Sequence, residues 1–319
     1  VYMTLAGSPY NDSNAKSLAK TQLENILNYS VANGDKYWAP TLDEWRKQWM
    51  PSTDYYNKYS IFAIQHRTNE NRNYLIFNFS PGLPPSYTSR RIFGNSIWVE
   101  KTLEYEFERT FSNGKKDGRG IGFTILEGYE EEPNYPAYTN DRENVILEDG
   151  TTVEVYTKTM FYKYLPSKPK LAELGMSFDE SSMAGDYDWP VNFPILRLED
   201  MMLLYAELLA DEGNVVEAMY YVNKIRERAG CDPETASTSA DALRLIKRER
   251  RVELAGEGIR WFDLVRYGEW QSAITRMFDN YNNPDGTDKS ELKNGRYLYP
   301  IPLDQMNAVP GLYSQNEGY

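Results

Sequence analysis

Residues 198–229 read LEDMMLLYAELLADEGNVVEAMYYVNKIRERA, and the spacing of their apolar side chains decides the fold. The first apolar set recurs every three or four residues and falls on one helical face, as Leu198, Met201, Met202, Tyr205, Leu208 and Leu209. Gly213 interrupts this pattern, and a second helical face follows with Val215, Ala218, Met219, Val222, Ile225 and Ala229. The stretch therefore predicts a helical hairpin.

The spacing within this hairpin is like that of a tetratricopeptide repeat (TPR), in which glycine makes the tight turn and alanine lets two helices approach closely. The residues at those positions are Tyr205, Gly213 and Ala218. A hairpin over residues 1–31 fits more loosely, with a helix over 14–31 whose apolar residues are Leu18, Leu23, Ile26 and Leu27. The two hairpins are either generic or parts of an interrupted solenoid, and we favour the solenoid.

The chain divides into three parts on this basis, and we expect them to form one domain over 1–319. Residues 1–31 form the first hairpin, and residues 194–319 form a helical C-terminal part in which Ser239 caps a third helix that ends near Ala255. Residues 32–193 form a long loop-rich insert with strand-like runs at 60–65, 121–126 and 151–156 and a helix near 100–110. The predicted fold class is mainly α, with TPR-like hairpins around an insert that contains short strands.

The composition excludes several classes of function. Asp and Glu outnumber Lys and Arg by 47 to 35, and the net charge of -12 opposes binding to nucleic acid. Cys231 is the only cysteine and His66 the only histidine, so a cysteine-based metal centre and a multi-histidine site are excluded. We expect no cofactor, and the sequence has no run of about 18 apolar residues that would predict a membrane-spanning helix.

Aromatic residues make up 14% of the chain, and many lie in polar segments rich in Gly, Pro and Asn. Exposed Tyr and Trp rings suit stacking against sugars, and neighbouring polar side chains orient hydroxyl groups. Three clusters are candidates. The proposed ligand residues among them are Trp98, Tyr87, Arg90 and Asn95 in the first cluster, Tyr135 and Tyr138 in the second, and Trp189 in the third; Arg91, Tyr129, Asn140, Asp141, Tyr187 and Asp188 accompany them. The alternative for each ring is that it anchors a loop to the core.

Two acidic features are candidates for other chemistry. Glu249 and Glu253 are one helical turn apart and could pair with Arg250, Arg260 or Arg266, which favours a structural ion network over acid–base catalysis. Residues 283–288, NPDGTD, offer oxygen ligands in a turn but lack the glutamate of an EF-hand, so a solvated turn is the better interpretation.

Several motifs make the chain resemble the SusD/RagB family of nutrient-binding proteins. They are PILRLED at 194–200, VNKIRERAG at 222–230, IKRERRVELAGEG at 246–258, RWFDLVR at 260–266, YPIP at 299–302 and PGL at 310–312. The likeness is thinner upstream, at 2–7, 60–65 and 117–119. Residues 1–7 read as the end of a helix, and with the family's lipidated cysteine not in the sequence we expect the chain to be the C-terminal portion of such a protein.

The resemblance implies a surface lipoprotein of the outer membrane that captures a glycan for a SusC-like, TonB-dependent transporter and has no catalytic activity. It also implies that the TPR-like hairpins face the transporter while loops present the ligand. Capture of peptide, and a pure protein-interaction scaffold, are the alternatives. A glycoside hydrolase would need two carboxyl groups about 5 to 9.5 Å apart beside an open groove, and the sequence offers no such pair outside the Arg-rich network.

Overall fold

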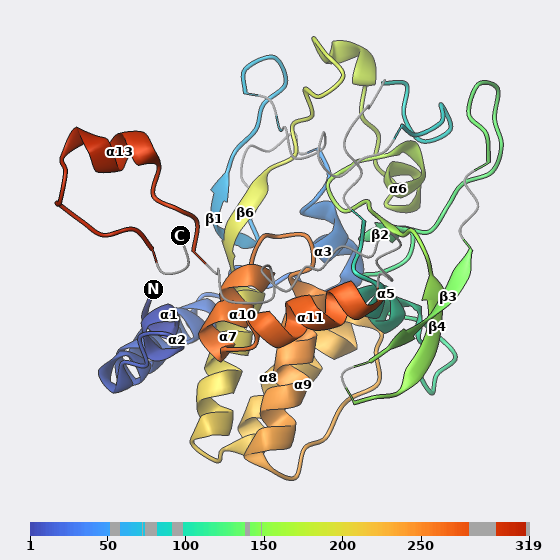
Figure 1. The fold of residues 1–319 in the computed structure, drawn as a ribbon. Helices are drawn as coiled ribbons and strands as arrows, with labels where there is room; N and C mark the ends of the chain where they lie inside the picture. Colours follow the sequence, from blue (N-terminus) through green and yellow to red (C-terminus); the bar gives the residue numbers. More distant parts are fainter. Residues whose placement is uncertain are drawn as a thin grey trace. The chain divides into compact units, whose positions relative to one another are not determined.

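The computed structural model describes residues 1–51, 58–71, 73, 82–90, 98–137, 141–147, 149–280 and 298–316. The chain forms two compact units (Figure 1). One combines residues 1–16 with 260–319, and the other consists of residues 17–259.

Helices dominate the described residues, which confirms the predicted fold class. The helices are α1 (Tyr2–Ala6), α2 (Ser13–Ala32), α3 (Leu42–Lys47), α5 (Lys101–Glu108), α6 (Lys168–Glu173), the 3₁₀-helix η1 (Glu180–Ser182), α7 (Leu198–Asp211), α8 (Val215–Ala229), α9 (Ser239–Glu253), α10 (Arg260–Tyr267), α11 (Trp270–Asn280) and α13 (Leu303–Ala308). The strands are β1 (Ser60–Ile64), β2 (Ile125–Leu126), β3 (Arg142–Ile146), β4 (Thr152–Tyr156), β5 (Met160–Phe161) and β6 (Phe193–Arg197).

The predicted hairpin is α7 and α8, which pack against each other and against α9. Gly213 has a φ of +85° in the turn between α7 and α8, and Gly230 has a φ of +77° at the end of α8, so both positions favour glycine. The residue that caps α9 is Thr238, whose hydroxyl oxygen accepts a hydrogen bond from the Asp241 amide at 3.1 Å, so the cap lies one residue earlier than predicted.

The helix α2 buries Leu23 and Leu27 of the predicted apolar set, whereas Ile26 is half-buried and Leu18 is 48% exposed. Its buried side chains also include Ala15 and Ala19, so the buried positions recur every four residues. Two hydrogen bonds join α2 to α7 and its C-terminal end. Tyr205 Oη donates to Glu24 at 3.0 Å, and Lys20 Nζ donates to Glu212 at 2.7 Å. Small residues at the first two buried positions explain why the larger Leu18 was mistaken for a core residue.

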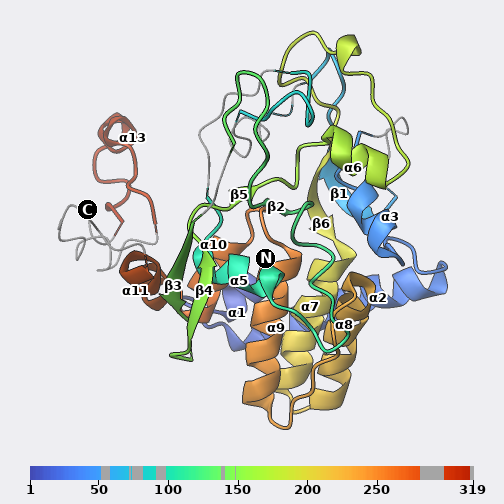
Figure 2. The ribbon, with the colours of Figure 1, turned by 90° about the vertical axis from the view of Figure 1, so that its right-hand side faces the viewer.

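The strands of the insert form three two-stranded antiparallel sheets, β1–β6, β2–β5 and β3–β4. The predicted helical C-terminal part began at residue 194, but residues 193–197 form β6, which pairs with β1 before α7 begins. A core of buried aromatic and aliphatic side chains fills the insert, including Trp45, Trp49, Phe123, Tyr164 and Trp189. Figures 1 and 2 both show α7, α8 and α9 side by side at one end of this unit, with α6, β1 and β6 toward the other.

In the other unit, α1 packs against α10 at a glycine contact. A Cβ atom on Gly7 would lie 2.5 Å from the carbonyl oxygen of Arg266, and the same carbonyl accepts a hydrogen bond from the Ser8 amide at 2.9 Å. Trp261 and Trp270 meet edge to face with ring centroids 6.1 Å apart. The close approach of Gly7 to Arg266 leaves no room for a side chain at position 7.

No helix in the described part of the chain combines the length and apolar character needed to cross a membrane.

Candidate ligand-binding site

A buried ion network connects the insert to the helices that carry it. Glu253 of α9 is fully buried and accepts hydrogen bonds from Arg119 at 2.7 Å, Arg197 at 3.0 Å and Arg228 at 2.8 Å. Burial alone would raise the pKa of Glu253, but the guanidinium groups of Arg228, Arg197 and Arg119 hold it well below its usual range. This carboxylate stays ionised and cannot serve as a general acid near neutral pH.

Glu249 joins the same network through Arg119 at 2.6 Å and Arg226 at 3.2 Å. The structural pairing predicted for Glu249 and Glu253 is therefore present, but the arginines differ from those predicted. Arg250 pairs with Asp200 at 2.8 Å, and Arg266 pairs with Asp263 at 2.8 Å. The partners that the sequence did not indicate are Arg119, Arg197, Arg226 and Arg228.

Polar contacts hold the loop that carries Tyr87 and Arg90. The carboxylate of Glu180 accepts hydrogen bonds from the Thr88 hydroxyl at 3.1 Å and from the Ser89 amide at 2.6 Å. Arg90 donates to the carbonyl oxygens of Glu180 and Met183, the latter at 2.8 Å. Arg90 was predicted as a ligand residue, but its side chain donates at least two hydrogen bonds that hold residues 82–90 against residues 180–183.

Trp189 lies in the core rather than at an accessible surface. Its side chain is fully buried, its ring centroid is 5.6 Å from that of Phe178, and its indole nitrogen donates to the Asp186 carbonyl at 3.2 Å. The neighbouring Asp188 accepts from the backbone amide of Asn69 at 2.7 Å. This is the loop-anchoring arrangement given above as the alternative to ligand stacking.

The structure gathers residues of the first two predicted clusters into one partly exposed group. The rings of Tyr87 and Tyr129 are 6.3 Å apart, and Tyr87 also meets the buried Tyr162 edge to face at 6.1 Å. Tyr135 closes a tight turn in which its amide and carbonyl exchange hydrogen bonds of 2.9 Å with those of Glu132. We call this group the tyrosine site, and define it as Tyr87, Tyr129, Tyr135, Glu130 and Glu132.

Acidic side chains lie close enough to Tyr87 of the tyrosine site to affect its pKa. Burial raises the pKa of Tyr87, and the carboxylates of Glu132 and Glu130 raise it further. Burial likewise raises the pKa of Tyr129, with a smaller contribution from Tyr135. The hydroxyls therefore remain protonated and can donate hydrogen bonds, while the two carboxylates can accept them.

Trp98 is the most accessible tryptophan. It is 38% exposed, whereas Trp38, Trp45, Trp49, Trp189 and Trp270 are buried and Trp261 is half-buried. Its backbone forms an antiparallel bridge with Met160, and the next amide, that of Val99, donates to the Thr159 carbonyl at 2.7 Å. These backbone contacts hold the Trp98 segment beside residues 159–160, and the ring remains partly accessible.

Other predicted ligand residues lie outside the described part of the chain. These are Asn95 and Tyr138, together with Arg91 and Asn140; the acidic turn at 283–288 lies outside it as well. The sequence did not indicate Glu130, Glu132 or Tyr162. The local signal for Glu130 and Glu132 was a run of acids between two tyrosines, Tyr129 and Tyr135. Their neighbour Tyr87 comes from a segment more than 40 residues earlier, so the sequence did not show that these residues would meet.

The chain belongs to the SusD family, whose sequence profile matches residues 27–319. Among curated relatives, the SusD-like protein P38 of Formosa agariphila is 32% identical over 143 residues, a match that covers 40% of this chain and 28% of that protein.

Solved structures of the same superfamily share the fold. A SusD superfamily protein from Parabacteroides distasonis has a TM-score of 0.68 at 20% identity, and the match covers all of this chain and 60% of that one. Surface glycan-binding protein A from Bacteroides thetaiotaomicron, in complex with laminarihexaose, has a TM-score of 0.62 at 19% identity over 96% of this chain and 61% of that one. The chain thus spans about three-fifths of these structures.

Proposed function

We propose that this chain is part of a non-catalytic protein that captures a glycan through the tyrosine site and Trp98. The observation that carries the proposal is the arrangement of Tyr87 and Tyr129, whose rings lie 6.3 Å apart in a partly exposed group beside Glu130 and Glu132. Aromatic faces stack on the apolar faces of sugar rings, and carboxylates accept hydrogen bonds from sugar hydroxyls. The laminarihexaose complex of a structural relative supports a glycan as the ligand.

The ion network supports a binding role rather than hydrolysis. A glycoside hydrolase needs a protonated carboxyl group that reaches the substrate. Glu249 and Glu253 are buried and paired with guanidinium groups, so they do not reach a ligand, and Glu253 holds no proton near neutral pH. The binding free energy would come from a few aromatic anchors, so weak affinity for a single sugar chain is expected.

Membership of the SusD family supports a place at the cell surface and delivery of the ligand to a SusC-like, TonB-dependent outer-membrane transporter. In this arrangement the protein is an anchored lipoprotein, the TPR-like hairpins face the transporter, and the insert faces outward. Peptide capture is the alternative ligand class, because tyrosine rings and carboxylates also bind peptides.

A groove on α8 favours a protein-interaction role as the second candidate function. Its volume is about 550 Å³, and the residues that line it include Met219, Tyr220, Lys224 and Glu227 of α8 together with Glu234. Tyr220 is 60% exposed, so its ring is accessible to a partner at this groove. A scaffold would use this face and leave the tyrosine site without a ligand.

The test is a binding screen of the purified chain against host and plant polysaccharides and oligosaccharides that include laminarihexaose. Saturable binding that is lost in Tyr129→Ala and Trp98→Ala, and kept in the control Tyr220→Ala, supports glycan capture by the proposed residues. Binding that all three variants retain would place the ligand elsewhere. Binding of peptides alone would reassign the ligand class, and binding that only Tyr220→Ala abolishes would favour the scaffold function.

A further inference from the structure

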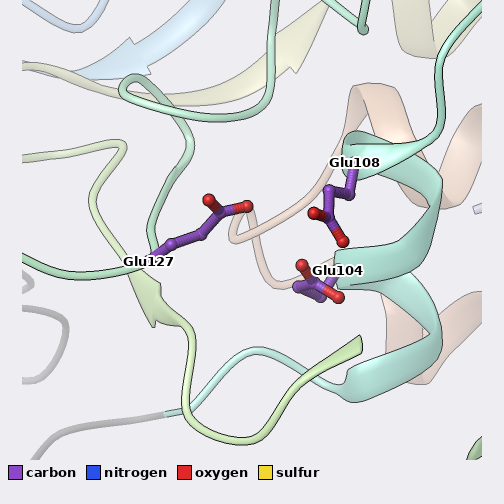
Figure 3. Close-up of side chains that lie close together, drawn as sticks. All are labelled: Glu104, Glu108 and Glu127. Carbon is purple, nitrogen blue, oxygen red and sulfur yellow. The ribbon is translucent and has the colours of Figure 1, made fainter. Parts of the chain in front are cut away.

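Three glutamates from two segments of the insert converge on one point. Glu104 and Glu108 are one turn apart on α5, and Glu127 follows directly after β2. One carboxylate oxygen from each residue lies within 4.8 Å of the others, and the three side chains point toward a shared space (Figure 3). This convergence joins a helix to a segment that begins 19 residues after that helix ends.

Glu104 is the member whose environment requires explanation. Its side chain is fully buried, and neither carboxylate oxygen accepts a hydrogen bond from a residue in the described parts of the chain. Burial and the carboxylates of Glu108 and Glu127 together raise the pKa of Glu104 to about 8, and the Tyr156 backbone and the Arg142 charge offset only part of that rise. A buried carboxylate that accepts no hydrogen bond needs a proton or a cation to neutralise its charge.

A second glutamate has a buried carboxylate oxygen without a hydrogen bond. Glu127 Oε1 lacks a hydrogen-bond partner among the described residues. Burial raises the pKa of Glu127, and the Glu108 carboxylate raises it further. Two of the three glutamates therefore bring unsatisfied carboxylate oxygens to the cluster.

The basic residues nearby already have carboxylate partners. Arg142 donates two hydrogen bonds to Glu108, one at 3.2 Å, and its guanidinium group also stacks on the Tyr156 ring at 4.0 Å. Lys116 lies 3.6 Å from the same Glu108 carboxylate. Another ion pair at α5 joins Lys101 to Glu143 at 2.5 Å. The direct contacts of Arg142 and Lys116 are thus with Glu108. Their charges act on Glu127 from farther away, as that of Arg142 does on Glu104, and the pKa of each of these two glutamates is still raised.

We propose that Glu104, Glu108 and Glu127 bind a divalent cation, and that Ca²⁺ is the ion that fits them best. Carboxylate oxygens are hard ligands, which Ca²⁺ and Mg²⁺ prefer and which soft metals do not. Two oxygens that both contact a Ca²⁺ ion at about 2.4 Å are at most about 4.8 Å apart, and the three carboxylate oxygens lie within that limit of one another, so they can share one ion. Mg²⁺ demands a near-ideal octahedron and gives up its bound water reluctantly, so a largely buried site made of protein carboxylates favours Ca²⁺.

The position of the cluster gives the cation a structural consequence. Glu127 lies two residues before Tyr129, so an ion held by Glu127 and α5 fixes the main chain that leads into the tyrosine site. Glu104 itself is fully buried and cannot contact a ligand of that site. Cation binding by these three glutamates does not depend on what the tyrosine site binds.

The experiment is calorimetric titration of the whole, chelator-treated chain with CaCl₂ and, separately, MgCl₂, at pH 7.5 in 0.15 M salt. The expected result is saturable Ca²⁺ binding with a dissociation constant of roughly 10⁻⁵ to 10⁻³ M and weaker binding of Mg²⁺. We expect Glu104→Gln and Glu127→Gln to weaken Ca²⁺ binding at least tenfold, because each removes one charged ligand. The matched control is Glu131→Gln, an exposed glutamate in the same segment, which should bind as the unchanged chain does.

Two outcomes would overturn the proposal. The first is an absence of saturable Ca²⁺ binding, with thermal stability that depends on pH and not on Ca²⁺; a proton alone would then neutralise Glu104. The second is Ca²⁺ binding that Glu104→Gln and Glu127→Gln both leave unchanged, which would place the cation at another site. Circular dichroism of each variant shows whether the chain is folded, and the Glu127→Gln result stands alone if Glu104→Gln does not fold.

Discussion

The indole nitrogen of Trp45 donates a hydrogen bond to the carboxylate of Glu253 at 2.8 Å across 208 residues of sequence. Trp45 belongs to α3 in the insert, and Glu253 ends α9 in the helical part. Both side chains are fully buried. The two regions therefore share a polar core that also includes Arg197 and Arg228, and the loops of the insert are built on a fixed base.

We expect Glu253→Gln to lower the free energy of unfolding by about 3 kcal/mol, because a buried ion network that loses one partner keeps uncompensated charges. Glutamine preserves the side-chain shape and can still accept the hydrogen bond from Trp45, so the loss reports mainly on the missing charge. Urea unfolding followed by tryptophan fluorescence measures the effect. The control Glu227→Gln removes an exposed charge on α8 and should change stability by less than about 0.5 kcal/mol. Equal stability of the two variants would contradict a network role for Glu253.

Gly120→Ala should destabilise the chain by about 1–3 kcal/mol, because it adds a methyl group to a packed core. A Cβ atom at this position would lie 2.7 Å from the Cβ atom of Phe107, and Phe107 is fully buried on α5 and has no room to move. Thermal unfolding measures the change. Gly185→Ala is the control, because its added Cβ would meet no atom within 4 Å. A neutral Gly120→Ala would mean that α5 shifts to accept the methyl group.

The sequence predicted the α7–α8 hairpin and α9 well because the signals are local. Apolar residues spaced by three or four, such as Met202 and Tyr205, specify one helical face whatever they pack against. Gly213 marks the turn in the same local way. The predicted strands at 60–65 and 151–156 were also found, as β1 and β4, within one residue of their ends.

Features that depend on distant partners could not be predicted in this way. Glu253 was expected to pair with arginines, but its partner Arg119 lies 134 residues earlier and nothing local marks it. Strand β6 was missed because its pairing partner β1 lies about 130 residues upstream. Trp189 illustrates the same limit, since a tryptophan in a polar segment gives no sign of which buried ring, here Phe178, it will meet.

The pH dependence of stability should reveal Glu104 when divalent cations are removed with a chelator. Its folded-state pKa of about 8 exceeds its ordinary value of 4.5, so the folded chain retains a proton that the unfolded chain loses as pH rises between those values. The contribution of Glu104 to stability is therefore full below about pH 4.5 and is lost as pH rises through about 8. We expect Glu104→Gln to remove this slope and to stabilise the chain at pH 8 by up to about 4 kcal/mol. Urea unfolding at several pH values measures both, and a Glu104→Gln variant with the original slope would assign the titration to another group.

Tyr129 offers a way to separate ring stacking from hydrogen bonding in glycan capture. Its ring lies 6.3 Å from that of Tyr87, and its hydroxyl donates to the Gly82 carbonyl at 3.5 Å, the outer limit of a hydrogen bond. Tyr129→Phe keeps the ring and should change glycan affinity by no more than about threefold, whereas Tyr129→Ala should weaken it about tenfold or more, as loss of an aromatic anchor typically does. Calorimetric titration with the glycan that binds in the screen measures both. Equal loss in the two variants would assign the contribution to the hydroxyl, and unchanged affinity in both would remove Tyr129 from the site.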